Sequence, residues 1–453
     1  MFLGPVRSPF RTLLALALPM MAARASQSVI TFADAVQVKH LGTGAIASVA
    51  TGGLNVVGVY VLPMSTVFIV QSFVAQLVGR GDRAETRRFA WYGLAIAAIA
   101  GLFGAALIPA VEPVLAHLDY SPAVRHDMAD YMQIRMLSVA AIVGVEALGN
   151  WYGGLGNTRM QMIAGLVTMV AAVFCNWLLI DGHLGAPAMG VRGAALASTI
   201  ASWLGHAYLA IAFWRGWGGA GRRRTPLALR ELGRVVRFGL PNGFNWFFEF
   251  AAFQLFVNIV VAGLGDTTVA ALNVVLAVNA IGFMPAFGLA SAGAIVAGHA
   301  IGAGDRDAVW PQVKLTLACT IGWMCALGAV YVLAPGALLE LFRPEHAGEG
   351  LVAVGTSMLW ISALWQVFDA SSMTFSETLR AAGDTAWVAG ARIVLAWLVF
   401  TPTAYLLVRR WHGGATGAMA CLVGYLALLA SVLALRFRSG RWRKIELIEP
   451  KLV

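Results

Sequence analysis

Apolar stretches long enough to cross a membrane follow one another along almost the whole of this chain. About 20 consecutive apolar residues, folded as a helix, span the hydrocarbon core of a bilayer. Of the 453 residues, 59% are hydrophobic and 12% are charged, whereas soluble domains carry about 25% charged residues. We therefore predict an all-α polytopic membrane protein with twelve transmembrane helices. The predicted spans are 13 to 38, 44 to 78, 88 to 116, 127 to 152, 160 to 181, 190 to 214, 239 to 264, 268 to 300, 312 to 340, 350 to 378, 385 to 408 and 414 to 436.

The basic residues are distributed unevenly between the two sides of these spans. The net charge is +10, and most of the 32 Lys and Arg residues lie on the side of the termini and the even-numbered loops. Because loops rich in Lys and Arg stay on the cytoplasmic side, we expect both termini in the cytoplasm and the protein in the inner (plasma) membrane. The basic loops then face anionic lipid, so membrane lipid and not nucleic acid is the expected partner.

An internal repeat relates the two halves of the chain. Each half holds six predicted helices, an even number, so we expect two lobes in the same orientation, as in many transporters. The expected organisation is an N-terminal lobe at 1 to 215, a basic cytoplasmic linker at 216 to 238, and a C-terminal lobe with a basic tail at 239 to 453. The matching motifs lie about 222 residues apart: Leu18-Pro19 with Leu240-Pro241, Leu41-Gly42 with Leu264-Gly265, Pro63 with Pro285, Gly79 to Arg83 with Gly302 to Arg306, and Leu155 to Thr158 with Ala382 to Thr385.

Three carboxylates stand out within the predicted spans, Asp34, Glu249 and Asp369, because no basic partner is evident in the same span. A charged side chain at the centre of a span costs roughly 2.5 to 3.5 kcal/mol on insertion scales, so each is a candidate functional residue. A low-dielectric cavity favours the protonated form of a carboxyl group, which can then take up and release a proton. Alternatively, carboxylate oxygens can hold Na⁺, here at Glu249 and Asp369. An interhelical hydrogen bond without a coupling role is the structural alternative.

Other polar and aromatic residues in the spans are weaker candidates. Gln27 and Thr31 fall on the same helix face as Asp34. Arg24 lies deep enough to pair with a carboxylate, whereas Glu146, Glu377 and Arg392 lie near span ends, where snorkelling or loop anchoring is expected. The candidates for a substrate cavity that accepts flat hydrophobic cations are Asn245, Trp246, Met284 and Trp365, with simple packing as the alternative.

These motifs resemble the multidrug and toxic compound extrusion (MATE) family, and the resemblance covers nearly the whole chain. The most specific match is Asp369 followed by the run from Leu379 to Thr385. Helix 7, with Gly239-Leu240-Pro241 and Glu249, also resembles the family pattern, as does Phe283-Met284-Pro285.

The resemblance implies two six-helix lobes and secondary active efflux of amphipathic organic cations or drugs, by antiport with H⁺ or Na⁺ through alternating access. Glu249 and Asp369 resemble the cation-binding carboxylates of the C-terminal lobe in the NorM-like branch, and Asp34 resembles the carboxylate of the N-terminal lobe. Asn176 and Ser198 fall where that lobe carries polar ligands in some members. Trp365 stands where some Na⁺-coupled relatives have Tyr and offers no oxygen ligand, which favours H⁺.

Three other functions are alternatives to efflux. A lipid or oligosaccharide flippase of the same superfamily would need a cavity rich in Arg and Lys. A transporter of the major facilitator type would explain Gly79 to Arg83 but not the intramembrane carboxylates. An enzyme is not expected, because no nucleophile, metal or phosphate-binding motif is present in the sequence. No cofactor is expected, and the protein is expected to act as a monomer on small organic cations.

Overall fold

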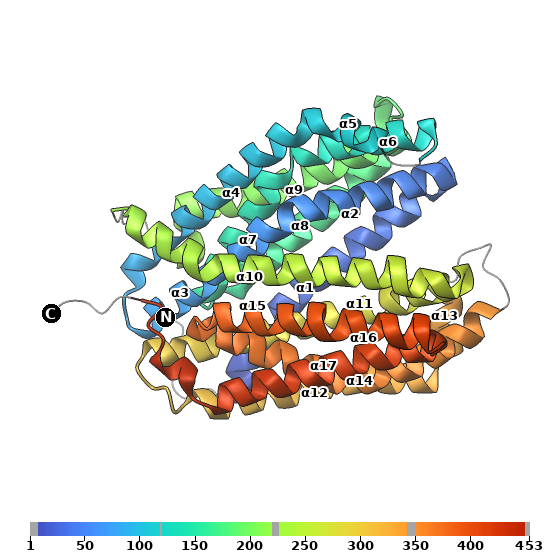
Figure 1. Ribbon diagram of the computed structural model, residues 1–453. Coiled ribbons are helices and arrows are strands. Elements are labelled where there is room, and N and C mark those ends of the chain that lie inside the picture. The colour runs from blue at the N-terminus through green and yellow to red at the C-terminus, as the bar shows by residue number, and fades with distance from the viewer. Residues whose placement is uncertain (1–7, 118–119, 220–225, 342–349, 449–453) are drawn as a thin grey trace. The chain divides into compact units, whose positions relative to one another are not determined.

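The computed structural model describes residues 8–117, 120–219, 226–341 and 350–448 as a bundle of helices joined by short connections (Figure 1). No strand occurs in these ranges. Eleven helical segments are long and apolar enough to cross a membrane, and a twelfth span forms if the bent pair of helices at 122–136 and 139–154 is counted as one. The predicted all-α fold with twelve spans is therefore confirmed for the described residues.

The helices of the first half of the chain alternate with short 3₁₀ turns. The fourth span is the bent one: its two helices meet at 44° around a break at 137–138. The helices are α1 (Pro9–Val38), α2 (Thr43–Thr66), α3 (Ile69–Gly79), α4 (Arg87–Leu107), α5 (Val111–Ala116), α6 (Pro122–Met136), α7 (Val139–Gly154), α8 (Thr158–Ile180) and α9 (Gly190–Arg215).

In the second half, α11 (Asp266–Gly302) and α14 (Gly350–Ala382) are single continuous helices where the first half has the pairs α2 with α3 and α6 with α7. The eleventh span contains two π-helical stretches, Leu395–Phe400 and Leu406–Arg410, on either side of a short α-helix. The helices are α10 (Leu229–Leu255), α11 (Asp266–Gly302), α12 (Val309–Leu333), α13 (Pro335–Leu341), α14 (Gly350–Ala382), α15 (Thr385–Val394), α16 (Thr401–Tyr405) and α17 (Gly414–Arg438).

Two span boundaries differ from the sequence prediction. Helix α10 begins at Leu229 and not at residue 239. Glu231 forms an ion pair with Arg88 and accepts a hydrogen bond from Tyr92, and these contacts hold the first turns of the helix. The ninth span ends at Leu333 and is followed by the separate helix α13, whose first residue is Pro335. Proline lacks the amide hydrogen that a continuing helix requires.

The internal repeat is visible in the backbone. Gly42 precedes α2 with φ 100° and ψ 169°, and Gly265 precedes α11 with φ 98° and ψ 162°. This region of the Ramachandran plot is open to glycine and strained for residues with a Cβ atom. The same unusual turn therefore begins the second span of each half, as expected if the two halves share one scaffold.

The chain folds into two compact units whose boundaries lie inside helices α1 and α10. One unit contains residues 22–243, and the other contains residues 1–21 and 244–453. We call them the N-terminal unit and the C-terminal unit. In the C-terminal unit, Leu13, Ala17 and Met20 of α1 pack in a buried cluster with Leu289 and Ile295 of α11.

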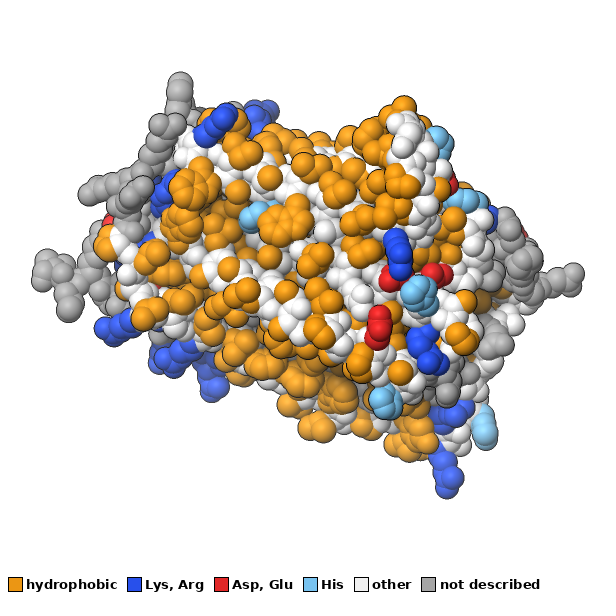
Figure 2. Space-filling view, turned by 90° about the horizontal axis from the view of Figure 1, so that it is seen from above, with side chains coloured by type: hydrophobic (Ala, Val, Ile, Leu, Met, Phe, Trp, Pro, Cys, Tyr) orange, Lys and Arg blue, Asp and Glu red, His pale blue; other side chains and the backbone are white. Residues whose placement is uncertain are grey.

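Within each unit, one long helix is surrounded by others. In the C-terminal unit α14 packs against α11, α12 and α17, and in the N-terminal unit α7 packs against α3, α4, α8 and α9. Large apolar side chains such as Leu102 and Leu398 are more than two-thirds exposed. Figure 2 shows hydrophobic side chains over much of one face, with Lys and Arg gathered towards its ends. This pattern fits a protein surrounded by lipid.

Candidate functional site

The first candidate site lies around Asp34 of α1, in the N-terminal unit. The amide of Asn176 on α8 donates a hydrogen bond of 2.5 Å to the carboxylate. The hydroxyl of Ser198 on α9 and the charge of Arg135 on α6 also act on it. The structure thus brings together the three residues Asp34, Asn176 and Ser198, which lie far apart in the sequence. The amide oxygen of Asn176 is buried and has no hydrogen-bond partner among the described residues.

Close packing of α8 against α9 positions these two polar ligands. Gly193 of α9 lies against the backbone of Leu179 on α8, and a Cβ atom at Gly193 would clash with the Leu179 carbonyl oxygen. Glycine at this position lets the two backbones approach, so that Asn176 and Ser198 both reach the Asp34 carboxylate.

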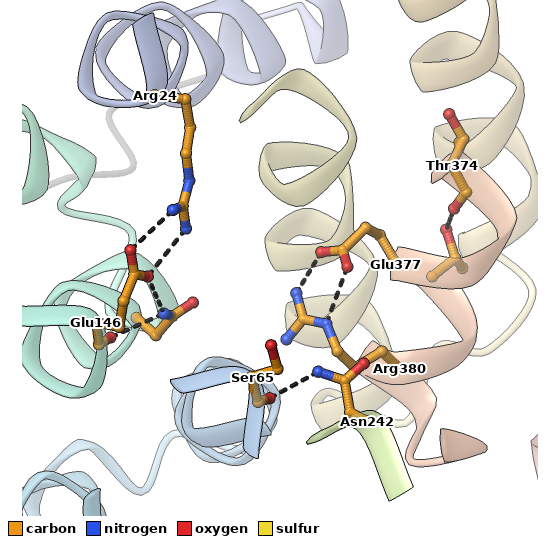
Figure 3. Close-up of polar contacts among 9 residues, drawn as sticks. Arg24, Ser65, Glu146, Asn242, Thr374, Glu377 and Arg380 are labelled. Carbon is orange, nitrogen blue, oxygen red and sulfur yellow. Dashed lines mark hydrogen bonds and ion pairs between the residues drawn. The ribbon is translucent and has the colours of Figure 1, made fainter. Parts of the chain in front are cut away.

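Gln27 and Thr31 do not join the Asp34 site. The side chain of Gln27 lies 3.5 Å from Glu146 Oε1, and the hydroxyl of Thr31 donates to the backbone oxygen of Gln27. Glu146 forms a two-pronged ion pair with Arg24, at 2.8 Å and 3.0 Å, and accepts a further hydrogen bond from Asn150 (Figure 3). The predicted polar face of helix 1 therefore serves two separate networks, one at each end.

The second candidate site lies in the C-terminal unit around Glu249 of α10. Arg392 of α15 donates a hydrogen bond of 2.7 Å to Glu249 Oε2, and the hydroxyl of Tyr425 on α17 lies 3.4 Å from Oε1. The Arg392 and Glu249 side chains are 11% and 28% exposed. Neither Arg392 nor Tyr425 was predicted as a site residue from the sequence, although Arg392 interrupts an otherwise apolar span.

Asp369 of α14 belongs to the same charged cluster. The charges of Arg392 and Glu249 both act on its carboxylate. No hydrogen bond from a described residue reaches that carboxylate: the nearby Ser372 hydroxyl donates instead to the backbone oxygen of Asp369. Glu249 and Asp369 therefore act on each other electrostatically, and Arg392 acts on both carboxylates.

The three residues expected to snorkel or to anchor loops at span ends are all buried, which contradicts the snorkelling alternative. Glu146 pairs with Arg24, and Arg392 pairs with Glu249. Glu377 pairs with Arg380 one turn further along α14 (Figure 3). A charged side chain away from water is stable when a partner of opposite charge neutralises it, and each of these residues has such a partner within its own unit.

The residues proposed to line a substrate cavity have different surroundings. Trp365 is 6% exposed and belongs to the main hydrophobic cluster of the C-terminal unit, so it packs the core. Trp246 packs edge-on against Phe287, and Met284 is partly buried. Asn245 is 3% exposed, and its amide oxygen has no partner among the described residues.

A multiply coordinated metal centre is not formed by the described residues, where no group of three or more His, Cys, Asp or Glu side chains could hold a metal ion. Glu249 and Asp369 supply two carboxylates at most, and Asp34 supplies one.

Comparison with known proteins identifies the family. A model of the MatE family matches residues 19–178 and 246–406. The chain belongs to the MatE family. The matched regions of this MatE protein include Asp34, Glu249, Asp369 and Arg392, and the resemblance inferred from its motifs is confirmed.

Relatives and solved structures extend over nearly the whole of this MatE chain. It is 27% identical over 446 residues to the multidrug resistance protein PmpM of Pseudomonas aeruginosa, covering 96% of this chain and 92% of the relative. It is 24% identical to a probable multidrug resistance protein NorM of Thermotoga maritima, covering 96% and 93%. Its fold matches an outward-facing multidrug resistance MATE transporter with a TM-score of 0.87 at 20% identity, covering 97% and 98%. The eukaryotic MATE transporter AtDTX14 matches with a TM-score of 0.84 at 17% identity, covering 96% and 98%.

Proposed function

We propose that this multi-pass membrane transporter exports amphipathic organic cations and drugs from the cell by antiport with H⁺ or Na⁺ through alternating access. The observation that carries the proposal is a partly buried carboxylate site in each unit, at Asp34 and at Glu249 with Asp369. A carboxylate inside the membrane can be neutralised by a small cation or by a cationic substrate. The two ligands therefore compete for the same negative charge. The names of the relatives, which are multidrug resistance proteins, support the same substrate class.

Competition for the carboxylates links the two fluxes. A proton or Na⁺ that binds from outside displaces the organic cation, and the organic cation displaces the ion when it binds from inside. Linkage makes this coupling reciprocal. We place the protein in the inner membrane as a monomer with both termini in the cytoplasm, in agreement with the distribution of Lys and Arg along the chain.

The test is ethidium efflux from proteoliposomes under an imposed pH gradient or an imposed Na⁺ gradient, each varied separately. We expect one of the two gradients to drive efflux, and we expect Asp34→Asn and Asp369→Asn to reduce the driven flux at least tenfold. Replacing the exposed Asp307, which pairs with Arg443, by Asn is the control and should leave the flux unchanged. Undiminished flux in the double variant Asp34→Asn/Asp369→Asn would contradict the assignment.

A further inference from the structure

We propose that Arg392 is a tethered counter-cation in the C-terminal unit: it keeps Glu249 ionised, leaves Asp369 as the carboxylate that takes the coupling proton, and excludes Na⁺. This inference rests on the proposed function, because it assigns the coupling ion and its carrier within the same site. It gives different roles to Glu249 and Asp369, which the sequence analysis assigns to the same role.

The polar groups of this cluster come from four helices, three of which carry a charged side chain. Glu249 lies on α10, Asp369 on α14 and Arg392 on α15, while Tyr425 of α17 contributes a hydroxyl. A guanidinium remains charged at physiological pH and has no acceptor capacity. With both carboxylates ionised the cluster carries one net negative charge, and a single added cation makes it neutral.

Glu249 has the partners that hold a carboxylate in its ionised form. It accepts a 2.7 Å charge-assisted hydrogen bond from Arg392 and a weaker one from Tyr425. Protonation of Glu249 would leave the Arg392 charge buried without a bonded carboxylate, and an uncompensated buried charge is strongly unfavourable. The pair is therefore neutral as a unit, and Glu249 is a positioning residue that fixes the guanidinium.

Asp369 lacks such partners. No described side chain donates a hydrogen bond to its carboxylate, and the neighbouring Ser372 hydroxyl donates to the Asp369 backbone oxygen instead. Like-charged carboxylates that share a site do not both stay ionised when one can take up a proton. The proton that neutralises the cluster therefore belongs on Asp369.

A sodium ion fits this cluster less well than a proton does. Na⁺ needs several oxygen ligands around it, but one oxygen of Glu249 is occupied by Arg392 and the Trp365 side chain one turn before Asp369 offers none. Two cations placed close together in a low-dielectric interior also repel each other. A proton forms a covalent bond to one Asp369 oxygen and needs no ligand shell.

The test reads protonation directly and needs no substrate. Infrared difference spectra between acidic and alkaline pH report the C=O stretch of protonated carboxyl groups in the purified full-length protein. All variants carry Asp34→Asn, so that the N-terminal site does not contribute. We expect the parent to show a pH-dependent carboxyl band that disappears in Asp369→Asn.

The Glu249 and Arg392 variants then separate a positioning role from a direct one. In Glu249→Gln, Arg392 is released to pair with Asp369 and keeps it ionised, so the Asp369 band is lost. In Glu249→Gln/Arg392→Gln both charges are absent, and the band returns. Arg392→Lys keeps the charge and should retain the parental band. An unchanged Asp369 band in Glu249→Gln, or no recovery in the double variant, would overturn the proposal.

Sodium provides the second readout. Exchange of choline chloride for NaCl should leave the spectrum and the thermal midpoint of the Asp34→Asn parent unchanged, whereas Asp34→Asn/Arg392→Gln should lose carboxyl-band intensity and gain thermal stability in NaCl. A Na⁺ response in the parent that disappears with Asp369→Asn would show that Na⁺ binds despite Arg392. These spectra are independent of transport, so failed ethidium efflux would reject the proposed function and leave this inference to be decided by the infrared result.

Discussion

The carboxylate sites of the two units use the same three helices of the repeat but different donors. In each unit a carboxylate on the first helix is contacted from the fifth and the sixth: Asp34 by Asn176 and Ser198, and Glu249 by Arg392 and Tyr425. The hydrogen-bond donors are neutral in the N-terminal unit, whereas one of them is a fixed cation in the C-terminal unit.

The two sites also lie at different levels of the repeated helices. In the repeat register Gln27, and not Asp34, corresponds to Glu249, so the carboxylates differ by seven positions, or about 10 Å along a helix axis. The shared scaffold thus holds each carboxylate against the same pair of helices, but the N-terminal site retains a free amide oxygen and the C-terminal site contains its own cation. A duplicated fold can place equivalent helices without placing equivalent charges.

Removal of the cationic donor should have the largest effect on this comparison. Arg392→Met leaves the partly exposed Glu249 carboxylate without its ion pair, and we expect a larger loss of stability than from removal of a neutral donor, because a charge-assisted hydrogen bond is about twice as strong as a neutral one. Asn176→Leu removes a neutral donor and should cost about 1 to 3 kcal/mol. The measurement is the thermal midpoint of each purified variant in detergent. Equal losses would show that the charge of Arg392 contributes no more than an amide does.

A more moderate effect is expected from Gly193→Ala, which pushes α8 away from α9. The added methyl group meets the Leu179 carbonyl oxygen, so we expect a loss of about 1 to 3 kcal/mol, as for other overpacked interiors. Ethidium efflux should fall together with stability, since Asn176 and Ser198 no longer reach Asp34 at the same time.

Gly390→Ala in α15 is the matched control for Gly193→Ala. No atom lies within 4 Å of the Cβ position at Gly390, and alanine favours the helix over glycine by up to about 1 kcal/mol. The thermal midpoint should therefore stay level or rise. A parallel loss in both variants would indicate a general intolerance of added side chains and not a requirement for close packing at Gly193.

The smallest effects should come from the hydroxyl donors. Tyr425→Phe removes a long hydrogen bond of 3.4 Å to Glu249, and Ser198→Ala removes the equivalent contact at Asp34. We expect each to cost about 1 kcal/mol or less, and the Tyr425 variant should cost less because Arg392 still neutralises Glu249. A larger loss for Tyr425→Phe than for Ser198→Ala would reverse that order and assign Tyr425 a role beyond the hydrogen bond.

Much of this fold could be predicted from the sequence, because the thickness of a bilayer fixes the length of apolar stretches and lipid penalises isolated charges. Those two constraints identify the spans and single out Asp34, Glu249 and Asp369. The motif resemblance adds Asn176 and Ser198 as possible polar ligands of the N-terminal lobe, and in the structure both side chains hydrogen-bond to Asp34.

Pairing could not be predicted, because it depends on which helix faces meet. From the sequence Arg392 is assigned to a span end, but its guanidinium donates a hydrogen bond to the carboxylate of Glu249, 143 residues earlier in the chain. Gln27 shares a helix face with Asp34, but its side chain contacts Glu146 on another helix. Trp365 lies one turn from Asp369 and still packs into the core. Helical periodicity relates residues on one helix and carries no information on the neighbouring one.

The division of α1 between the two units has a consequence for biosynthesis. Residues 1–21 are made first, but their packing partners in α11, including Leu289 and Ile295, are made after the whole N-terminal unit has been translated. The N-terminal unit, residues 22–243, is one continuous segment of the chain and can assemble while the second half is still being translated. The N-terminal part of α1 therefore lacks its packing partners until α11 has been translated. Cleaving the chain between residues 219 and 226 would produce two fragments that each lack part of a unit, so neither should fold stably unless the other is made with it.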